Sequence, residues 1–250
     1  MASPYAGVSA DGWAKITGEL LAAHPLRSDL ILEAALVSWD RLWSTRVGDE
    51  KLGFPLVDLD PPATVVGYFF EKLFANELAN RLPGEWRGGR GSEKDLYCIS
   101  NEAMSVEMKS SGQLGYKVYG NRSYGQKVEN ADAAKKDKSG YYITINFHKQ
   151  TLTLLRFGWI DAEDWQAQKS ATGQMAGLGD EVYAHKLVVI AGKHMLAGPV
   201  QLLDGVGAKA AAALEAIGVR TIAELLQAKE LPPAFKRLQG KALERYKELV

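Results

Sequence analysis

The sequence predicts a mixed α/β fold in which helices come first, a mixed central sheet follows, and a small all-α segment ends the chain. Three observations support this prediction. Apolar residues recur every three to four positions in much of the stretch 11–82, which is typical of amphipathic helices. Several stretches between 95 and 190 instead alternate apolar and polar residues, as half-buried strands do. From Gly192 onward the chain is rich in Ala, Leu and Lys and shows no strand pattern.

The expected elements follow in order along the chain. The helical spacing predicts two helices within 11–46, the second capped by Ser28, and a third over 63–82 that opens after Pro61 and Pro62. Two segments are rich in glycine and are expected to be loops, 48–62 and the basic stretch 84–94. A short helix is expected at 161–168, and strands at 95–100, 104–110, 141–148, 151–160 and 183–190. A domain boundary is expected near residue 195, which divides the chain into 1–195 and 196–250.

The composition excludes several classes of protein. The 250 residues are 46% hydrophobic and 24% charged, as in globular proteins. The formal net charge of zero gives no basic surface over the whole molecule, although a local one is enough to bind nucleic acid. Cys98 is the single cysteine, so an intramolecular disulfide and a cysteine zinc site are excluded. We expect no membrane span, no signal peptide and no nucleotide cofactor, and therefore a cytoplasmic protein.

Two strands carry ionisable residues within apolar surroundings. If residues 101–103 form a three-residue turn, Ser100 faces Met104, Tyr97 opposes Glu107, and Asp95 opposes Lys109. Residues that oppose each other in an antiparallel pair share a face of the sheet. Asp95, Glu107 and Lys109 would then converge on one patch, whereas a slip of one residue would send Asp95 to the other face.

This set of residue types fits a metal-dependent hydrolase. Mg²⁺ takes oxygen ligands, which Asp95, Glu107 and the carbonyl of Met108 could supply. A lysine beside the metal can orient the attacking water, which favours hydrolysis of a phosphodiester bond. The alternative is a salt-bridge cluster on a half-exposed sheet, against which the apolar neighbours of these residues argue.

The pattern of Asp95 followed by Glu107-Met108-Lys109 resembles the D-x(n)-(D/E)-x-K signature of the PD-(D/E)XK nuclease superfamily, with Lys94 where proline is usual. The resemblance implies a restriction-endonuclease-like sheet flanked by helices, and an upstream helix whose glutamate points into the site. Glu71 is the candidate for this glutamate and Glu77 the competitor. Gly67 lies one turn before Glu71, which would let the helix approach the sheet closely.

The segment after the second strand interleaves basic, amide and aromatic side chains, which are suited to contact phosphates and bases. The alternative is a solvated loop. The string E-x-K-S-S followed by G-N-R-S-Y resembles type II restriction endonucleases, specifically the ScaI-like group. The resemblance implies Mg²⁺-dependent, sequence-specific cleavage of double-stranded DNA by a homodimer, with 5′-phosphate products. The candidates for DNA contact in this segment are Lys117, Tyr119, Asn121, Arg122, Ser123 and Gln126.

The string LDGVGAKAAAAL, residues 203–214, matches a helix-hairpin-helix pattern. Gly205 and Gly207 allow a tight turn that exposes backbone N–H groups at a helix N-terminus, where a phosphate can bind. Lys209 adds a positive charge in the first turn. The alternative is a module for packing or oligomerisation. Gly218 is expected to end this helix and Thr221 to cap the next.

Three functions remain open at this point. The first is a Mg²⁺-dependent, site-specific endonuclease of the restriction type. The second is a nuclease of the same fold that acts in DNA repair or on junctions. The third is a DNA-binding protein without catalytic activity, in which the Glu-x-Lys pattern is accidental.

Overall fold

The computed structural model describes residues 2–49, 51–121, 138–167 and 175–250. The chain forms two compact units. The large unit consists of residues 1–111, 117–145 and 155–190, and the small unit of residues 112–116, 146–154 and 191–250. Each unit therefore combines several segments of the sequence, and the boundary near residue 195 stays a prediction.

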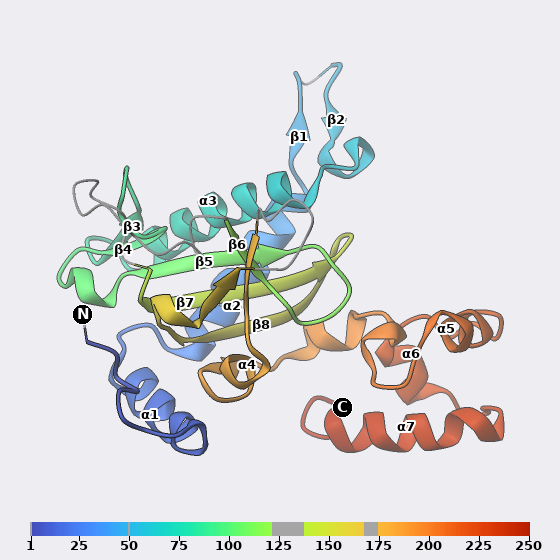
Figure 1. Ribbon diagram of the computed structural model, residues 1–250. Coiled ribbons are helices and arrows are strands. Elements are labelled where there is room, and N and C mark those ends of the chain that lie inside the picture. The colour runs from blue at the N-terminus through green and yellow to red at the C-terminus, as the bar shows by residue number, and fades with distance from the viewer. Residues whose placement is uncertain (1, 50, 122–137, 168–174) are drawn as a thin grey trace. The chain divides into compact units, whose positions relative to one another are not determined.

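A six-stranded sheet, most of which belongs to the large unit, has the order β11-β8-β7-β5-β4-β3 (Figure 1). β7 is buried over most of its length, including Tyr142 and Ile143, which have no solvent exposure. The mixed α/β fold class is therefore confirmed. The strands of this sheet are β3 (Trp86–Gly88), β4 (Leu96–Cys98), β5 (Val106–Ser111), β7 (Gly140–His148), β8 (Thr151–Ile160) and β11 (Leu187–Val189).

Helices cover the sheet. α3 (Ala63–Arg81) packs against β3 and β5, and α2 (Ser28–Trp43) packs against α3. Phe70, Phe74 and Leu78 lie one turn apart on α3 and are fully buried, because one helix face meets the sheet. α1 (Ala10–Ala23) packs on the short α4 (Asp180–His185), which precedes β11.

Smaller elements complete the large unit. β6 (Tyr119–Asn121), β10 (Met175–Leu178) and β9 (Trp165–Ala167) form a three-stranded sheet. β1 (Arg46–Val47) and β2 (Phe54–Pro55) form a hairpin, followed by the 3₁₀ turn η1 (Leu56–Leu59). None of the helices in the described part of the chain combines the length and the apolar character that a membrane span requires.

The three helices expected before residue 82 and the hairpin over 141–160 are confirmed, with small shifts of their ends. The strand expected at 183–190 is wrong, because its first half completes α4 and β11 alone is extended. The expected loop 84–94 contains β3, and 161–168 forms the 3₁₀ turn η4 (Ala162–Asp164) followed by β9. Arg27 rather than Ser28 occupies the N-cap of α2.

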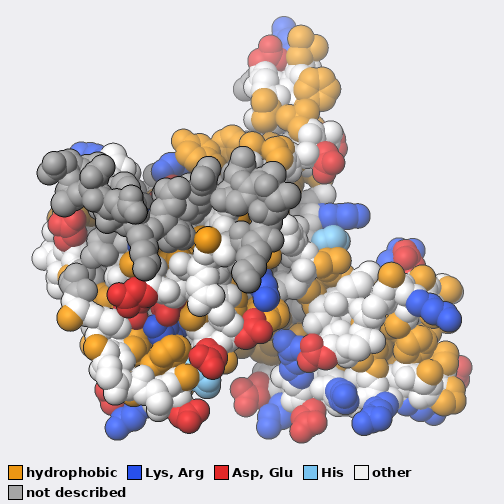
Figure 2. All heavy atoms as spheres, viewed as in Figure 1, with side chains coloured by type: hydrophobic (Ala, Val, Ile, Leu, Met, Phe, Trp, Pro, Cys, Tyr) orange, Lys and Arg blue, Asp and Glu red, His pale blue; other side chains and the backbone are white. Residues whose placement is uncertain are grey.

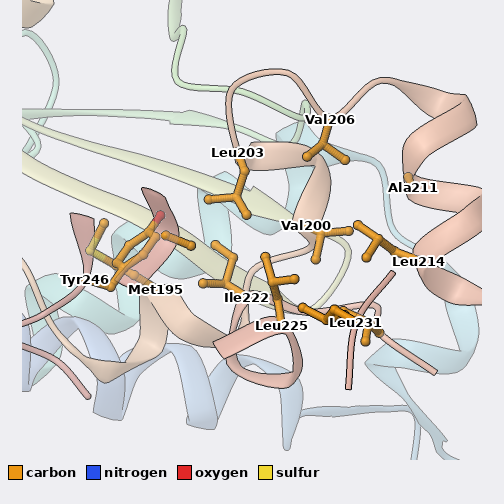
Figure 3. Packing of buried hydrophobic residues seen from close by; sticks show 12 residues of the cluster. Met195, Val200, Leu203, Val206, Ala211, Leu214, Ile222, Leu225, Leu231 and Tyr246 are labelled. Carbon is orange, nitrogen blue, oxygen red and sulfur yellow. The ribbon is translucent and has the colours of Figure 1, made fainter. Parts of the chain in front are cut away.

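The small unit contains short helices around its own apolar core (Figure 3). Thr221 caps α6, as expected: its side chain accepts the Glu224 N–H while Glu224 reaches back to the Thr221 N–H. Ile222 and Leu225, just inside that cap, are fully buried. The helical elements are η5 (Lys193–Ala197), η6 (Val200–Leu202), α5 (Ala208–Glu215), α6 (Ile222–Gln227) and α7 (Pro233–Arg245).

A buried charge cluster ties together distant segments of the large unit. Lys186, which is 2% exposed, donates to Asp161 at 2.9 Å and to Asp164 at 2.8 Å. Its ammonium also lies over the rings of Tyr5 and Trp13, at 4.2 and 4.3 Å from their centroids. The lysine is therefore paired on all sides, as a buried charge must be.

Candidate active site on β5 and α3

The three residues of the Glu-x-Lys pattern and Asp95 meet at the start of β5. Asp95 lies directly before β4, and its Oδ2 accepts the Met108 N–H at 2.8 Å. Lys109 Nζ donates to Glu107 Oε1 at 2.7 Å and to the Met108 carbonyl at 3.0 Å. Asp95, Glu107, Met108 and Lys109 are thus joined by one network of hydrogen bonds.

The expected register of this hairpin is wrong by two residues. Leu96 pairs with Val106, so continuing the ladder places Glu107, rather than Lys109, opposite Asp95. The connection is longer than three residues because η2 (Glu102–Met104) forms there, with the Asn101 side chain accepting the Ala103 N–H. A shift of two residues keeps every side chain on its face, so Asp95 still lies on the side expected for it.

Burial distinguishes this cluster from an ordinary surface ion pair. Glu107 is 4% exposed, and the Lys109 side chain is 15% exposed. Exposed ion pairs contribute little, whereas a buried carboxylate requires a partner to stay charged. These side chains are therefore more buried than a salt-bridge cluster on a half-exposed sheet would be.

A cavity of about 410 Å³ opens between α3 and β5. Glu71 contributes to one wall, and Met108 and Lys109 contribute to the opposite one. Glu77, the competing glutamate, is instead paired with Arg41 and Arg81 and lies elsewhere on α3. The remaining lining residues are Ala63, Thr64, Gly67, Tyr68, Phe70, Ser110, Tyr119 and Ile145.

Gly67 sets the distance between the two walls. A Cβ at this position would lie 2.1 Å from Ser110 Oγ and 3.2 Å from Ser110 Cβ. Any side chain at residue 67 would therefore collide with β5 next to Lys109. The close approach of α3 expected from this glycine is present, and it brings Glu71 to the cavity.

Lys72 is a charged neighbour of the site that the sequence analysis missed. Its Nζ donates to Glu71 Oε1 at 2.6 Å. This hydrogen bond raises the pKa of Lys72, and the negative charges of Glu71 and Asp95 add to the effect. No local pattern indicated it, because successive residues in the middle of a helix point in different directions.

The donor set fits a hard divalent cation. Asp95, Glu107 and the Met108 carbonyl offer oxygen atoms, which Mg²⁺ prefers, and Mg²⁺ usually keeps water in the rest of its shell. Within the described ranges no three His, Cys, Asp or Glu side chains are grouped closely enough to hold a metal. The set is therefore two carboxylates and a carbonyl, with Glu71 across the cavity.

The structure places some of the residues expected to contact DNA. Tyr119 lines the cavity, whereas Lys117 pairs with Asp180 at 3.4 Å. Asn121 ends β6, with its side chain outside the described part of the chain. Arg122, Ser123 and Gln126 also lie outside the described residues.

The glycine hairpin of the small unit has the expected local geometry. Gly205 has a φ of +87°, which favours glycine, and Gly207 forms the N-cap of α5. Lys209 is exposed in the first turn of α5. The helix before the hairpin is the 3₁₀ turn η6 of 3 residues, so it is very short. Gly218, with a φ of +80°, follows the end of α5.

Comparison with known proteins identifies the family. The family model for the ScaI restriction endonuclease matches residues 3–191. The type II restriction enzyme ScaI of Streptomyces caespitosus is 37% identical over 198 residues, which cover 75% of this chain and 84% of that protein. A search of the solved structures found no match. The chain therefore belongs to the ScaI restriction endonuclease family and is a site-specific deoxyribonuclease.

Proposed function

We propose that the chain hydrolyses phosphodiester bonds of double-stranded DNA in a Mg²⁺-dependent reaction at Asp95, Glu107 and Lys109. One observation carries this proposal. Lys109 Nζ contacts both the Glu107 carboxylate and the Met108 carbonyl, while Asp95 accepts the N–H of the same Met108. Two carboxylates, a carbonyl and an ammonium group thus share one hydrogen-bond network, in which Met108 and Lys109 line the cavity.

Each group has a separate role in the proposed reaction. Asp95, Glu107 and the Met108 carbonyl would hold Mg²⁺, which when bound lowers the pKa of water and offsets negative charge on the phosphate. Lys109 orients the attacking water, because its ammonium group is in hydrogen-bond contact with two of the ligand atoms. Glu71, across the cavity, holds a further water or a second ion.

The proposed products follow from which bond breaks. The water oxygen forms a bond to phosphorus, in line with the P–O3′ bond, which breaks. The attacking water gives up one proton and the 3′-oxygen takes one, so a 3′-hydroxyl group forms and the phosphate stays on the 5′-end. Because the described residues of one chain offer one such site, cleavage of both strands is proposed to take a homodimer on a palindrome.

The proposed DNA contacts divide into two kinds. Tyr119, at the cavity wall, begins the segment of Asn121, Arg122, Ser123 and Gln126, which is proposed to read bases together with Lys117. Gly205, Gly207 and Lys209 are proposed to bind a phosphate through the backbone N–H groups at the start of α5. The second kind of contact carries no sequence information.

Digestion of a sequenced plasmid with Mg²⁺, followed by end mapping, tests the activity. Discrete fragments with 5′-phosphate ends are expected. A smear would instead favour a repair nuclease, and cleavage confined to branched DNA would favour a junction nuclease.

Two variants test the assigned site. Lys109→Ala and Asp95→Asn are each expected to lower the cleavage rate by about 100-fold or more. Asparagine is chosen because its side-chain oxygen can still accept the Met108 N–H, so the sheet is kept while the charge is lost. Lys15→Ala, at an exposed lysine on α1, is the control. Wild-type rates in both site variants would place the chemistry elsewhere.

A further inference from the structure

α7 in the small unit has two contrasting faces. Ala242 and Tyr246 are buried in the core of the small unit, and Phe235 and Leu238 pack against it. Arg237, Lys241 and Arg245 are exposed. Residues four apart on a helix lie on the same face, one turn above each other. These three side chains therefore form a stripe along the helix, called the α7 stripe here.

The α7 stripe belongs to a locally basic segment of a neutral chain. Residues 233–250 contain five Lys or Arg and two Glu, which leaves three excess positive charges, whereas the whole chain has 30 of each sign. Lys236 and Lys247 flank the stripe, and Glu244 and Glu248 are the two acids. Figure 2 shows Lys and Arg side chains, with some acidic ones among them, on the exposed surface of the small unit.

The stripe is not neutralised by partners within the small unit. Arg220 pairs with Glu215 at 3.1 Å, which shows that an ion pair forms elsewhere in this unit. Within residues 192–250, all of which the structure describes, Arg237 and Lys241 form no such pair. Arg245 lies 5.4 Å from the ring of Tyr246. The charges of Arg237 and Lys241 are therefore directed to solvent and can meet a polyanion, whereas Arg245 also lines a cavity with Asp204.

Gly240 lies within the exposed part of α7, next to the stripe. A Cβ at this position would meet nothing within 4 Å, so packing inside the chain does not require glycine. Glycine in a helix interior destabilises the helix relative to alanine. Glycine also allows another backbone to approach closely, and the open space at Gly240 leaves room for one.

We propose that the α7 stripe binds the phosphate backbone of double-stranded DNA, as a sequence-independent anchor outside the catalytic region. DNA carries one negative charge per about 1.7 Å, so three cations at intervals of about 6 Å can all find phosphates. The family match ends at residue 191, so this contact adds to what the matched region does. The inference rests on DNA being the substrate and not on the assignment of Asp95, Glu107 or Lys109.

Salt dependence of binding, measured without cleavage, tests the proposal. The full chain and its Arg237→Gln/Lys241→Gln variant are titrated with a labelled duplex of about 40 base pairs in EDTA, and fluorescence anisotropy reports binding. Each lost phosphate contact lowers the slope of log K against log salt by about 0.9. The slope is thus expected to fall by about two, so that wild type loses about tenfold more affinity than the variant between 50 and 200 mM salt.

Two further variants are expected to change the affinity for DNA in opposite directions. Glu244→Gln removes a repulsive charge beside the stripe and is expected to tighten DNA binding. Gly240→Ala is expected to raise the thermal unfolding temperature and yet to weaken binding, because its methyl group stands where the DNA backbone approaches. A purely structural role for α7 would not separate stability from binding in this way.

The control has the same change in charge at a different place. Lys15 and Lys51 are exposed in the large unit, so Lys15→Gln/Lys51→Gln lowers the net charge by the same two units. Equal salt slopes in both double variants, or no change in the α7 variant, would overturn the proposal. So would an unchanged DNA affinity accompanied by lost binding to phosphatidylserine vesicles, which would assign the stripe to an anionic membrane. If cleavage is lost while α7-dependent DNA binding is normal, the result contradicts only the proposed catalytic residues and leaves the α7 proposal standing.

Discussion

Replacement of Gly67 tests whether the closeness of α3 and β5 is necessary for cleavage. An alanine Cβ would lie 2.1 Å from Ser110 Oγ, where ordinary contacts begin at 3.4 Å. Rotation of the Ser110 hydroxyl can relieve this contact, but the Cβ–Cβ contact of 3.2 Å remains. α3 must then move away by a few tenths of an ångström, and Glu71 moves with it.

The expected effects on stability and on activity differ in size. Overpacking costs about 1–3 kcal/mol, and alanine in place of glycine in a helix returns about 1 kcal/mol. The free energy of unfolding is therefore expected to fall by about 1 kcal/mol. A misplacement of about 1 Å costs about 100-fold in rate, so Gly67→Ala is expected to cleave about tenfold more slowly and Gly67→Val about 100-fold.

Plasmid cleavage rates and urea unfolding measure both effects on the same preparations. Ser110→Gly removes both atoms that the new Cβ meets, so adding it to Gly67→Ala is expected to restore much of the rate. Gly18→Ala is the matched control, because this exposed glycine of α1 has nothing within 4 Å of its Cβ position. Wild-type rates in both Gly67 variants, or no rescue by Ser110→Gly, would refute the reasoning.

Two further predictions concern charged groups outside the cavity. Lys186→Met leaves Asp161 and Asp164 without their cation, so the free energy of unfolding, measured in urea, is expected to fall by about 3–5 kcal/mol. Adding Asp161→Asn and Asp164→Asn to this variant should restore most of the lost free energy of unfolding. The hydrogen bonds from Arg87 lower the pKa of Glu93 from 4.5 to about 2, and Arg87→Gln should return it towards 4.5 in an NMR titration. Because the folded pKa is the lower one, this pair stabilises the fold above pH 4.5 and less as the pH falls towards 2. A Lys186→Met variant as stable as wild type would contradict the first prediction. A pKa of Glu93 that is unchanged by Arg87→Gln would contradict the second.

Local periodicity predicted the long elements well and the short ones poorly. α3 buries Phe70, Phe74 and Leu78 at helical spacing, so its existence can be read from the sequence. The stretch 183–190 contains only the last three residues of α4, less than one turn, before the β-branched residues of β11. The strand pattern of Val188 and Val189 therefore concealed the helix end. Segments this short are decided by their tertiary neighbours rather than by propensity.

The grouping of the candidate site residues could be predicted from the sequence, and its geometry less so. The Glu107–Lys109 spacing, with Asp95 before β4, predicted three residues that the structure joins in one hydrogen-bond network. The register could not be derived, because the Asn101 side chain binds the Ala103 N–H and so turns the connection into a 3₁₀ turn. Lys72 was missed because its role depends on the distance to Asp95 across the fold, which no local pattern encodes.

The β7–β8 hairpin belongs to both units, and this limits how the molecule can be engineered. Residues 146–154 at its tip lie in the small unit, and Leu154 packs against the core of that unit. Residues 112–116 are also part of the small unit. A gene fragment that encodes only 192–250 would therefore lack two of the segments that complete its fold. Transplanting the DNA anchor proposed for α7 onto another nuclease would require those segments too, and truncation at residue 191 would leave apolar side chains of the hairpin exposed.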